Sequence, residues 1–449
     1  MNKPFFTFVF GLLTSFVFAQ RQSPNVILIM ADDMGYECLS TYGSSSYHTP
    51  NLDLLAQNGI QFQNCIAQPL CSPSRVKLMT GQYNYRNYEY FGYLNINQKT
   101  FGNLMKEAGY ATCIAGKWQL NGLNNTAQVT DWNDAFRPKK FGFDEFCLWQ
   151  LTKMATEGER YADPLIDKNG TLMRPGENAY GPDIFSDFVL DFIENKKNKP
   201  FFIYYPMVLV HDPFVPTPDS KAWASPALRK KSDPQYFKDM VTYMDKIVGK
   251  IYQKLKEQNL LDNTILIFTA DNGTNVQIRS FMQDNSSIQG AKGNTIDAGV
   301  HVPLIVHWPN KIKSHLRYNG LIEFSDFYPT FAELTNQKSV TDGKSFYPLL
   351  AGKKYKDRED AFVYYDPRWG ANVNKYRNCF VQTTDYKLYQ DGKFYDIKND
   401  RLEQHPLATN QLNTTQLKTR KKLEEQLNKN LQGRKWVSSA RASESLNKN

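Results

Sequence analysis

The chain has 449 residues, of which 41% are hydrophobic, 22% charged and 14% aromatic, a composition that excludes an intrinsically disordered chain and predicts a folded globular protein. Its length predicts one large domain together with a smaller one. The formal net charge is +9, but no nucleic-acid-binding motif accompanies the basic residues, so nucleic acid is not an expected partner.

The N-terminus has the pattern of a secretory signal peptide. Lys3 gives a positive start, residues 5–18 are mostly apolar, and Val17 and Ala19 fit the small residues of a cleavage site. The apolar run is too short to span a bilayer. We therefore predict that residues 1–19 are removed by cleavage after Ala19. The mature protein is then secreted or periplasmic and has no membrane anchor.

Short apolar runs alternate with helical patterns through the first 310 residues. The apolar runs are residues 25–30, 200–205, 264–269 and 303–307, and the helical patterns are residues 49–58, 100–108, 183–195 and 233–258. Continuous apolar runs are typical of strands that are buried on both faces of a mostly parallel sheet. The pattern predicts an α/β fold in which helices sandwich a large, mostly parallel central sheet.

The pattern changes after residue 352. The apolar runs are now short and bounded by turns, at residues 361–365, 379–383, 386–389 and 393–396. Asp391-Gly392 is a hairpin signal, and Leu423, Leu427 and Leu431 form the apolar stripe of a terminal helix. These features predict a smaller C-terminal antiparallel sheet plus a helix. We divide the mature chain into a main domain at 20–350, a small α+β subdomain at 351–435 and a disordered tail at 436–449.

The C-terminal segment is strongly basic. From Gln411 to the end there are nine Lys or Arg residues against three Glu residues. A solvated helix and a surface that attracts polyanions both account for this charge.

Polar residues follow three of the apolar runs. Asp32 and Asp33 come after the first run, Asp271 and Asn272 after the third, and His211 lies a few residues beyond the second. Ligands of open α/β sheets bind beyond the carboxyl ends of strands. Four oxygen donors suit a hard cation such as Ca²⁺. Asp-Asn-Gly is also a common turn, so the acidic residues alone leave both interpretations open.

The segment from Cys71 to Arg75 reads Cys-Ser-Pro-Ser-Arg, which is the pattern C-x-P-x-R. Taken alone, this pattern also fits a buried or disulfide-bonded cysteine beside a turn. The chain has six cysteines, at positions 38, 65, 71, 113, 147 and 379, and an even number in an oxidising compartment permits pairing.

The C-x-P-x-R segment resembles the signature of the type I sulfatases, which belong to the alkaline-phosphatase superfamily. Further segments match that family in order and spacing, at residues 24–36, 42–43, 49–53, 116–118, 211–214, 271–273, 290–293 and 299–306. The resemblance extends from residue 24 to about residue 406. It implies an alkaline-phosphatase-like fold and sulfuric ester hydrolase activity.

The resemblance implies that a formylglycine-generating maturation enzyme converts Cys71 to formylglycine. One hydroxyl of the hydrated aldehyde then attacks sulfur, and the other expels sulfate as the aldehyde re-forms. It also implies a Ca²⁺ site, with Mg²⁺ as the less suitable alternative. The implied metal ligands are Asp32, Asp33, Asp271, Asn272 and the modified Cys71.

Four further side chains receive roles from the resemblance. Arg75, Lys117 and Lys292 are the cations that hold the hydrated aldehyde and the sulfate oxygens. His211 is the proton donor to the leaving alcohol.

The sequence departs from the family pattern at Gln119, where the family usually has histidine after Gly-Lys-Trp. Glutamine forms hydrogen bonds but does not titrate, so the substitution affects proton transfer at the catalytic position. We expect the enzyme to be active nevertheless, because the nucleophile, the metal ligands and the three cations are present. Asp297 stands where the family commonly has glutamate, which is a smaller departure.

The secretion signal and the aromatic content favour a sulfated polysaccharide, or its oligosaccharides, as the substrate over small aryl esters. The aromatic segment 83–93 fits either a sugar subsite or the protein core. Two other functions remain open at this stage: a phosphate or phosphonate monoester hydrolase of the same superfamily, and a non-catalytic binder of sulfated glycan.

Overall fold

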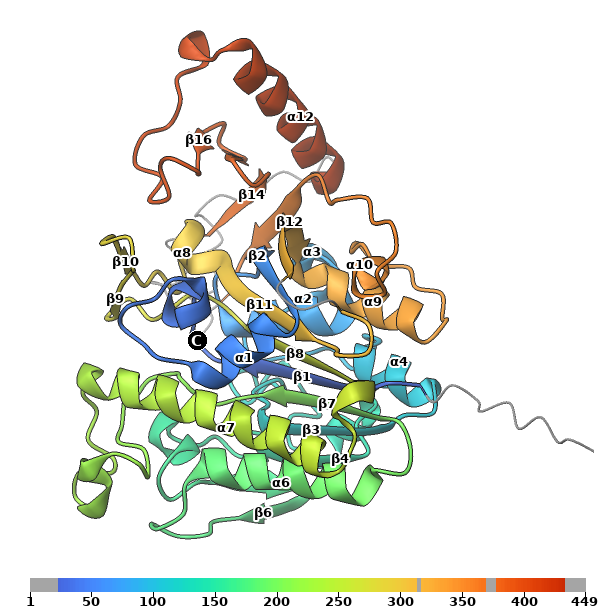
Figure 1. Cartoon of the computed structure of the whole chain (residues 1–449), viewed down its shortest axis with the longest axis vertical. Coiled ribbons are helices and arrows are strands. Elements are labelled where there is room, and N and C mark those ends of the chain that lie inside the picture. Colours follow the sequence, from blue (N-terminus) through green and yellow to red (C-terminus); the bar gives the residue numbers. More distant parts are fainter. Residues whose placement is uncertain (1–22, 313–315, 369–376, 433–449) are drawn as a thin grey trace, which may run out of the picture.

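A computed structural model describes residues 23–312, 316–368 and 377–432, apart from the side chain of Glu157. The predicted signal peptide (1–19), the predicted tail (436–449) and the last three residues of the predicted subdomain lie outside these residues. A ten-stranded sheet forms the centre of the molecule, in the order β12-β2-β11-β8-β1-β7-β3-β4-β5-β6 (Figure 1). Its strands are β1 (Asn25–Ala31), β2 (Ile60–Ile66), β3 (Ala111–Lys117), β4 (Glu145–Trp149), β5 (Ile166–Lys168), β6 (Thr171–Met173), β7 (Phe201–Pro206), β8 (Thr264–Ala270), β11 (His301–His307) and β12 (Leu316–Glu323).

The middle of this sheet is parallel. Strands β8, β1, β7, β3 and β4 are parallel neighbours, and every residue of β1, β3, β7 and β8 is buried. All four predicted apolar runs are strands. The fourth, β11, runs antiparallel to both β8 and β2. Its direction differs from that of the other three because an apolar run shows burial on both faces and not the orientation of the strand.

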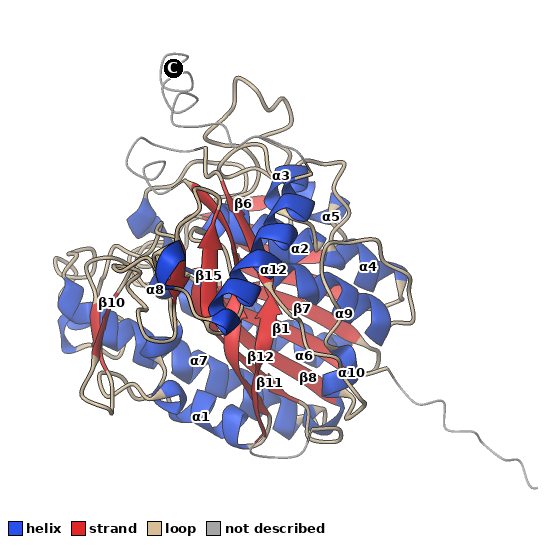
Figure 2. Ribbon diagram, turned by 90° about the horizontal axis from the view of Figure 1, so that it is seen from above, coloured by secondary structure: helices blue, strands red, loops and turns tan. Residues whose placement is uncertain are grey.

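Helices cover both faces of the sheet (Figure 2). Helices α1 (Pro50–Gln57), α6 (Gly181–Lys196) and α7 (Phe237–Glu257) pack together as one group, and α2 (Cys71–Thr80), α4 (Phe101–Glu107) and α9 (Phe327–Leu334) pack together as another. The predicted helical patterns correspond to α1, α4, α6 and α7. Four short helices complete the main part: α3 (Asn84–Asn87), α5 (Arg137–Lys140), α8 (Asp297–Val300) and α10 (Tyr347–Leu350).

A four-stranded antiparallel sheet follows, with β13 (Ala361–Tyr365), β14 (Asn378–Gln382), β15 (Tyr386–Tyr389) and β16 (Phe394–Asp396). Helix α12 (Thr414–Leu431) packs against β14 and β15, and its Leu423, Leu427 and Leu431 are buried. The predicted fold class is thus confirmed, while the boundary at residue 350 stays a prediction. A separate hairpin, β9 (Arg279–Phe281) and β10 (Ser287–Gln289), lies at the edge of the main part.

Three further expectations concern the cysteines, the membrane and the aromatic segment 83–93. All six cysteines are buried free thiols, so the structure contains none of the disulfides that an even number permits. Within the described residues, no helix has the length and apolarity needed to cross a bilayer. In the aromatic segment 83–93, Tyr83, Tyr88, Phe91 and Tyr93 are buried, and Tyr83 packs edge-on against Phe362, as expected of core residues.

Candidate active site

The acidic residues converge at the carboxyl edge of the two central strands. Asp32 and Asp33 follow β1, and Asp271 and Asn272 follow β8, which pairs with β1 in register up to Ala31 and Ala270. The parallel pairing therefore places the two segments side by side. The backbone N–H of Asp33 donates to Asp271 Oδ1 at 3.0 Å, and Asn272 Nδ2 donates to Asp33 Oδ1 at 2.9 Å. All four side chains are fully buried.

Helix α2 begins at Cys71 and carries Arg75 one turn later, on the same side of the helix. Arg75 donates to Asp271 Oδ2 from Nε at 3.2 Å and from Nη2 at 2.9 Å, and to the backbone oxygen of Lys117 from Nη1 at 3.1 Å. Cys71 is buried, and burial raises the pKa of its thiol, so the unmodified side chain is a neutral thiol.

Lys117, the last residue of β3, binds the carboxylate of Asp32. Its Nζ lies 3.0 Å from Oδ1 and 2.8 Å from Oδ2. Burial alone raises the pKa of Asp32, but the positive charges of Lys117, Arg75 and Arg160 outweigh burial and hold that pKa far below its usual value. Asp32 is therefore an anion throughout the physiological pH range.

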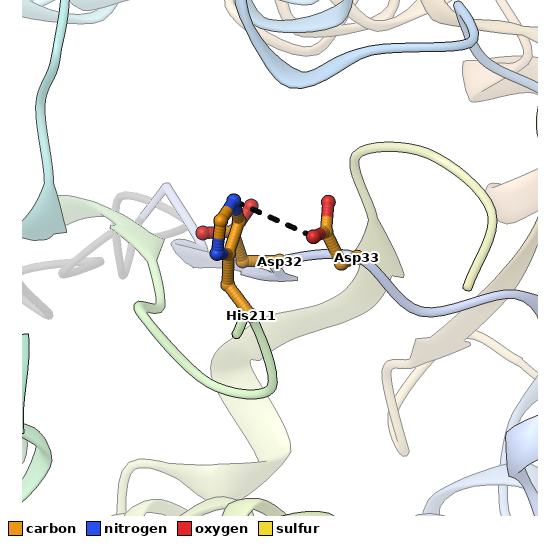
Figure 3. Close-up of side chains that lie close together, drawn as sticks. All are labelled: Asp32, Asp33 and His211. Atoms are coloured by element: carbon orange, nitrogen blue, oxygen red, sulfur yellow. Dashed lines mark ion pairs between the residues drawn. The ribbon is translucent and has the colours of Figure 1, made fainter. Parts of the chain in front are cut away.

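Lys292, Asp33 and His211 form a second group of contacts, and Figure 3 shows the imidazole of His211 facing the carboxylate of Asp33. Lys292 Nζ lies 2.5 Å from Asp33 Oδ2 and 2.9 Å from His211 Nε2, and His211 Nε2 is 3.4 Å from the same Asp33 oxygen. Burial lowers the pKa of Lys292, but the charge of Asp33 and other anions outweighs burial and raises it above its usual value. An ammonium group only donates, so His211 Nε2 accepts from Lys292, and Nδ1–H donates to the backbone oxygen of Asp212 at 2.6 Å.

The donor set fits a hard divalent cation. Asp32, Asp33 and His211 offer ligand atoms that lie within 4.8 Å of one another, and Asp271 and Asn272 add oxygens from the neighbouring strand. Asn272 Oδ1 is buried and has no hydrogen-bond partner among the described residues, as expected of an oxygen placed to bind a cation. A thiol at position 71 suits a soft metal, whereas an oxygen at the same position would complete a set for Ca²⁺ or Mg²⁺.

Gln119 lies two residues beyond the end of β3 in a left-handed conformation, with φ of 50°. Its backbone N–H donates to Gln150 O at 3.3 Å. Its side-chain Oε1 is buried, and within the part of the chain that the structure describes this atom has no hydrogen-bond partner. The structure thus places the Gln119 backbone at the carboxyl edge of the sheet, beside Lys117.

Arg160 and Tyr161, which follow β4, were not predicted from the sequence. The buried guanidinium of Arg160 lies 4.1 Å from the Trp149 ring, and its Nη1 is 3.5 Å from Asp32 Oδ2. Tyr161 donates its hydroxyl to the backbone oxygens of Val208, at 2.9 Å, and His211. Neither residue belongs to a recognisable motif, and the only signal in the sequence is their position after a strand of the sheet.

The fold and this cluster define a class of protein. It is an α/β protein with a buried cluster of side chains at the carboxyl edge of its sheet, in which carboxylates alternate with cations in an arrangement suited to a metal ion and a small anion.

Comparison with known proteins identifies the family. The family model described as Sulfatase matches residues 24–337, and the model described as N-sulphoglucosamine sulphohydrolase, C-terminal, matches residues 292–433. The chain therefore belongs to the sulfatase family and is a sulfuric ester hydrolase.

Similar proteins include sulfatases of bacteria and mammals. An N-acetylgalactosamine-6-O-sulfatase from Bacteroides thetaiotaomicron is 30% identical over 413 residues, covering 75% of this chain and 78% of the relative. Human arylsulfatase A is 30% identical over 406 residues, covering 83% of this chain and 75% of the relative. The crystal structure of Ps i-CgsB in complex with k-i-k-neocarrahexaose aligns with a TM-score of 0.72 at 25% identity, covering 95% of this chain and 97% of that one.

Proposed function

We propose that this protein is a secreted or periplasmic sulfatase that acts on sulfated polysaccharide or its oligosaccharides, with a formylglycine made from Cys71 and a bound Ca²⁺ ion. The observation that carries the proposal is the position of Cys71. It begins helix α2 near enough to Lys117, Asp271 and Asp32 for their charges to act on the pKa of its thiol. Relatives named for sulfated sugars support a carbohydrate substrate.

In this proposal Asp32, Asp33, Asp271 and Asn272 hold the metal through their oxygens. A Ca²⁺ ion held by these residues would supply positive charge that offsets the negative charge of the sulfate group. Arg75 and Lys117 remain fixed by Asp271 and Asp32, so their donors are already oriented when an anion arrives. A pocket organised in this way stabilises the charge of the transition state without reorganising itself.

Formylglycine solves the problem of releasing sulfate. Its hydrate carries two hydroxyls: one attacks sulfur as the bond from sulfur to the alcohol oxygen breaks, and the other loses its proton as the aldehyde re-forms and sulfate leaves. Gln119 stands where a proton-transfer histidine is usual, so its amide is assigned to orienting a hydroxyl or a sugar group rather than to carrying a proton.

Protonation of the leaving alcohol is assigned to His211 with Lys292. The two nitrogens lie 2.9 Å apart, and the Nδ1–H bond to Asp212 O fixes the imidazole ring. A proton that Nε2 takes from solvent can pass to the alcohol oxygen, while Lys292, whose pKa is raised, keeps its own proton beside Asp33.

Peptide mass spectrometry combined with activity measurement tests the proposal. The protein is produced with and without a formylglycine-generating enzyme and assayed on defined sulfated oligosaccharides, on 4-nitrophenyl sulfate and on the matching phosphate ester. We expect activity to rise in proportion to the fraction converted at Cys71 and to favour sulfate esters. Full activity with an unmodified thiol would refute the nucleophile, and a preference for phosphate would refute the substrate class.

Chelation tests the metal. Removing Ca²⁺ should abolish turnover and lower the melting temperature, because a ligand that binds only the native state stabilises it. Asn272→Leu should lower the affinity for Ca²⁺ measured by calorimetry. Unchanged activity after exhaustive chelation would contradict the metal site.

A further inference from the structure

A shallow groove of about 330 Å³ lies between the β9–β10 hairpin and the start of α7. Its ten lining residues include two cations, Lys238 and Arg279, and no acidic residue. Among the residues that the structure describes, neither cation has a carboxylate within ion-pairing distance. Phe281 also lines the groove, and 56% of its surface is exposed. A concave surface with unpaired cations and an exposed aromatic ring is suited to an anionic ligand that has an apolar face.

The wall formed by the hairpin is connected to the proposed active site by the chain and by hydrogen bonds. It begins a few residues after the metal ligand Asn272, and Asn275 Nδ2 donates to Asp212 Oδ1 at 3.3 Å, beside His211. The groove-lining Ile278 accepts a backbone hydrogen bond at 2.9 Å from Gly290, two residues before Lys292. The position of this wall is therefore tied to the loops on both sides of the catalytic cluster.

The residues of the opposite wall of the groove follow the His211 loop along the chain. Phe214 lies three residues after that histidine, and its ring packs edge-on against the groove-lining Phe237 with centroids 5.4 Å apart. Its backbone oxygen also accepts from the N–H of Asp233 at 2.8 Å, just before the groove-lining Pro234. The two loops that carry Lys292 and His211 thus continue outward as the two sides of one groove.

We propose that this groove is a second subsite, which binds a sulfated sugar of an oligosaccharide whose target sulfate ester lies in the catalytic pocket. Lys238 and Arg279 bind the sulfate or carboxylate group of that sugar, and Phe281 packs against its apolar face. The amides of Gln235 and Gln277 line the same groove and supply donors and acceptors for hydroxyls. The inference rests on the proposed function, since it assumes that the substrate is a sulfated chain.

Two consequences follow if the groove is a subsite. The groove should favour long substrates over short ones, because a small aryl sulfate does not reach it. The advantage should also fall with ionic strength, because exposed charges are screened over about 8–10 Å at physiological salt.

The test measures kcat/KM on 4-nitrophenyl sulfate and on sulfated hexasaccharides from chondroitin 6-sulfate and from carrageenan. We expect the ratio of hexasaccharide to aryl sulfate activity to fall about threefold in Lys238→Gln and in Arg279→Gln, and about tenfold in the double variant. The loss should appear in KM and not in kcat. Phe281→Ser should lower the same ratio.

Lys256→Gln is the matched control, because Lys256 is an exposed lysine near the other end of α7 and lies about 27 Å along the helix from Lys238. It should leave the ratio unchanged. Equal ratios in the double variant, the control and the wild type would overturn the subsite, while turnover of sulfate esters would keep the proposed function intact.

Direct binding settles the subsite even if no hexasaccharide is turned over. Calorimetry on the Cys71→Ala protein should show an affinity for at least one sulfated hexasaccharide that weakens in the Lys238→Gln/Arg279→Gln background and in high salt. An affinity that these changes leave unaltered, or no affinity for either hexasaccharide, would contradict the subsite.

Discussion

At the scale of single residues, Asp32 is the carboxylate that three buried cations contact. Lys117 lies 2.8 Å from its carboxylate, Arg75 lies 3.4 Å away and Arg160 lies 3.5 Å away. A carboxylate that is buried with three cations is oriented more firmly than one held by a single ion pair, because rotation would break several contacts at once. Asp32 can therefore present a fixed oxygen to a metal ion.

Arg160 should contribute to turnover by holding Asp32. We expect Arg160→Met, which keeps much of the contact with Trp149, to lower kcat/KM on 4-nitrophenyl sulfate about 10- to 100-fold, since a hydrogen bond to a charged group contributes about 1.5–3 kcal/mol. The Arg160→Met substitution should also change the affinity for Ca²⁺. The Arg160→Lys variant should recover part of the lost kcat/KM. Arg174→Met is the control, because Arg174 is exposed and pairs with Glu159 of the same segment. Equal losses in both variants would contradict the role.

Gln119 should act on the sugar rather than on the proton. We expect Gln119→His to raise KM and to leave the single-turnover rate of sulfate release little changed, because an amide suits sugar hydroxyls and Gln119 Oε1 has no protein partner among the described residues. Rapid-quench measurement of sulfate release checks this. Faster release in the histidine variant, with a new pH dependence near neutrality, would show instead that glutamine is a weakened substitute for the family's histidine.

At the scale of secondary-structure elements, strand β15 of the small sheet fixes the loop that carries Lys292. Lys387 Nζ donates to the backbone oxygen of Thr295, three residues after Lys292. The Tyr389 hydroxyl, which also contacts Glu403 Oε2, lies 3.3 Å from the same backbone oxygen. Glu403 Oε1 accepts from Lys387 at 2.8 Å, which balances the buried charge. The C-terminal sheet therefore contributes to the site without supplying a residue of the catalytic cluster.

Removing one hydroxyl tests this connection. We expect Tyr389→Phe to lower kcat about three- to tenfold with a smaller change in KM, because losing a buried hydrogen bond of roughly 1 kcal/mol lets the Lys292 loop move. Tyr386→Phe changes a half-buried tyrosine of the same strand and serves as the control. If both variants keep the wild-type kcat and only their melting temperatures differ from that of the wild type, the contact of Tyr389 with Thr295 contributes to stability and not to turnover.

The same elements show what the sequence could predict. The ends of β1, β8, α1 and α4 were predicted within one or two residues, since continuous apolar runs and helical spacing mark buried strands and helices. The antiparallel direction of β11 was not predicted, because burial on both faces of a strand does not depend on the direction of the strand.

In the site, the structure brings the residues of several motifs together, whereas Arg160 and Lys387 were not singled out from the sequence. A lysine on a strand normally predicts an exposed position. Lys387 is buried instead, and its charge is balanced by Glu403, which lies outside the strand and 16 positions further along the chain.

At the scale of the whole molecule, the pH dependence of stability should reflect a buried histidine far from the catalytic cluster. His307 ends β11, its ring lies 5.7 Å from that of Tyr252, and burial lowers its pKa to about 4. The unfolded chain has the ordinary histidine pKa of about 6.5 and so binds a proton more readily than the folded protein between these values. Stability contributed by neutral His307 is therefore complete above about pH 6.5 and is lost as the pH falls towards 4.

We expect the wild type to lose about 2 kcal/mol more free energy of unfolding than His307→Gln when the pH falls from 7 to 5. A neutral amide does not charge in the unfolded state, so the variant lacks this source of acid sensitivity. Urea titrations at the two pH values, with Ca²⁺ saturating throughout, measure the difference. His405→Gln changes an exposed histidine and should retain the acid sensitivity of the wild type. If the His307 and His405 variants lose the same stability on acidification, the buried imidazole is not its source, and the carboxylates of the catalytic pocket become the groups to examine.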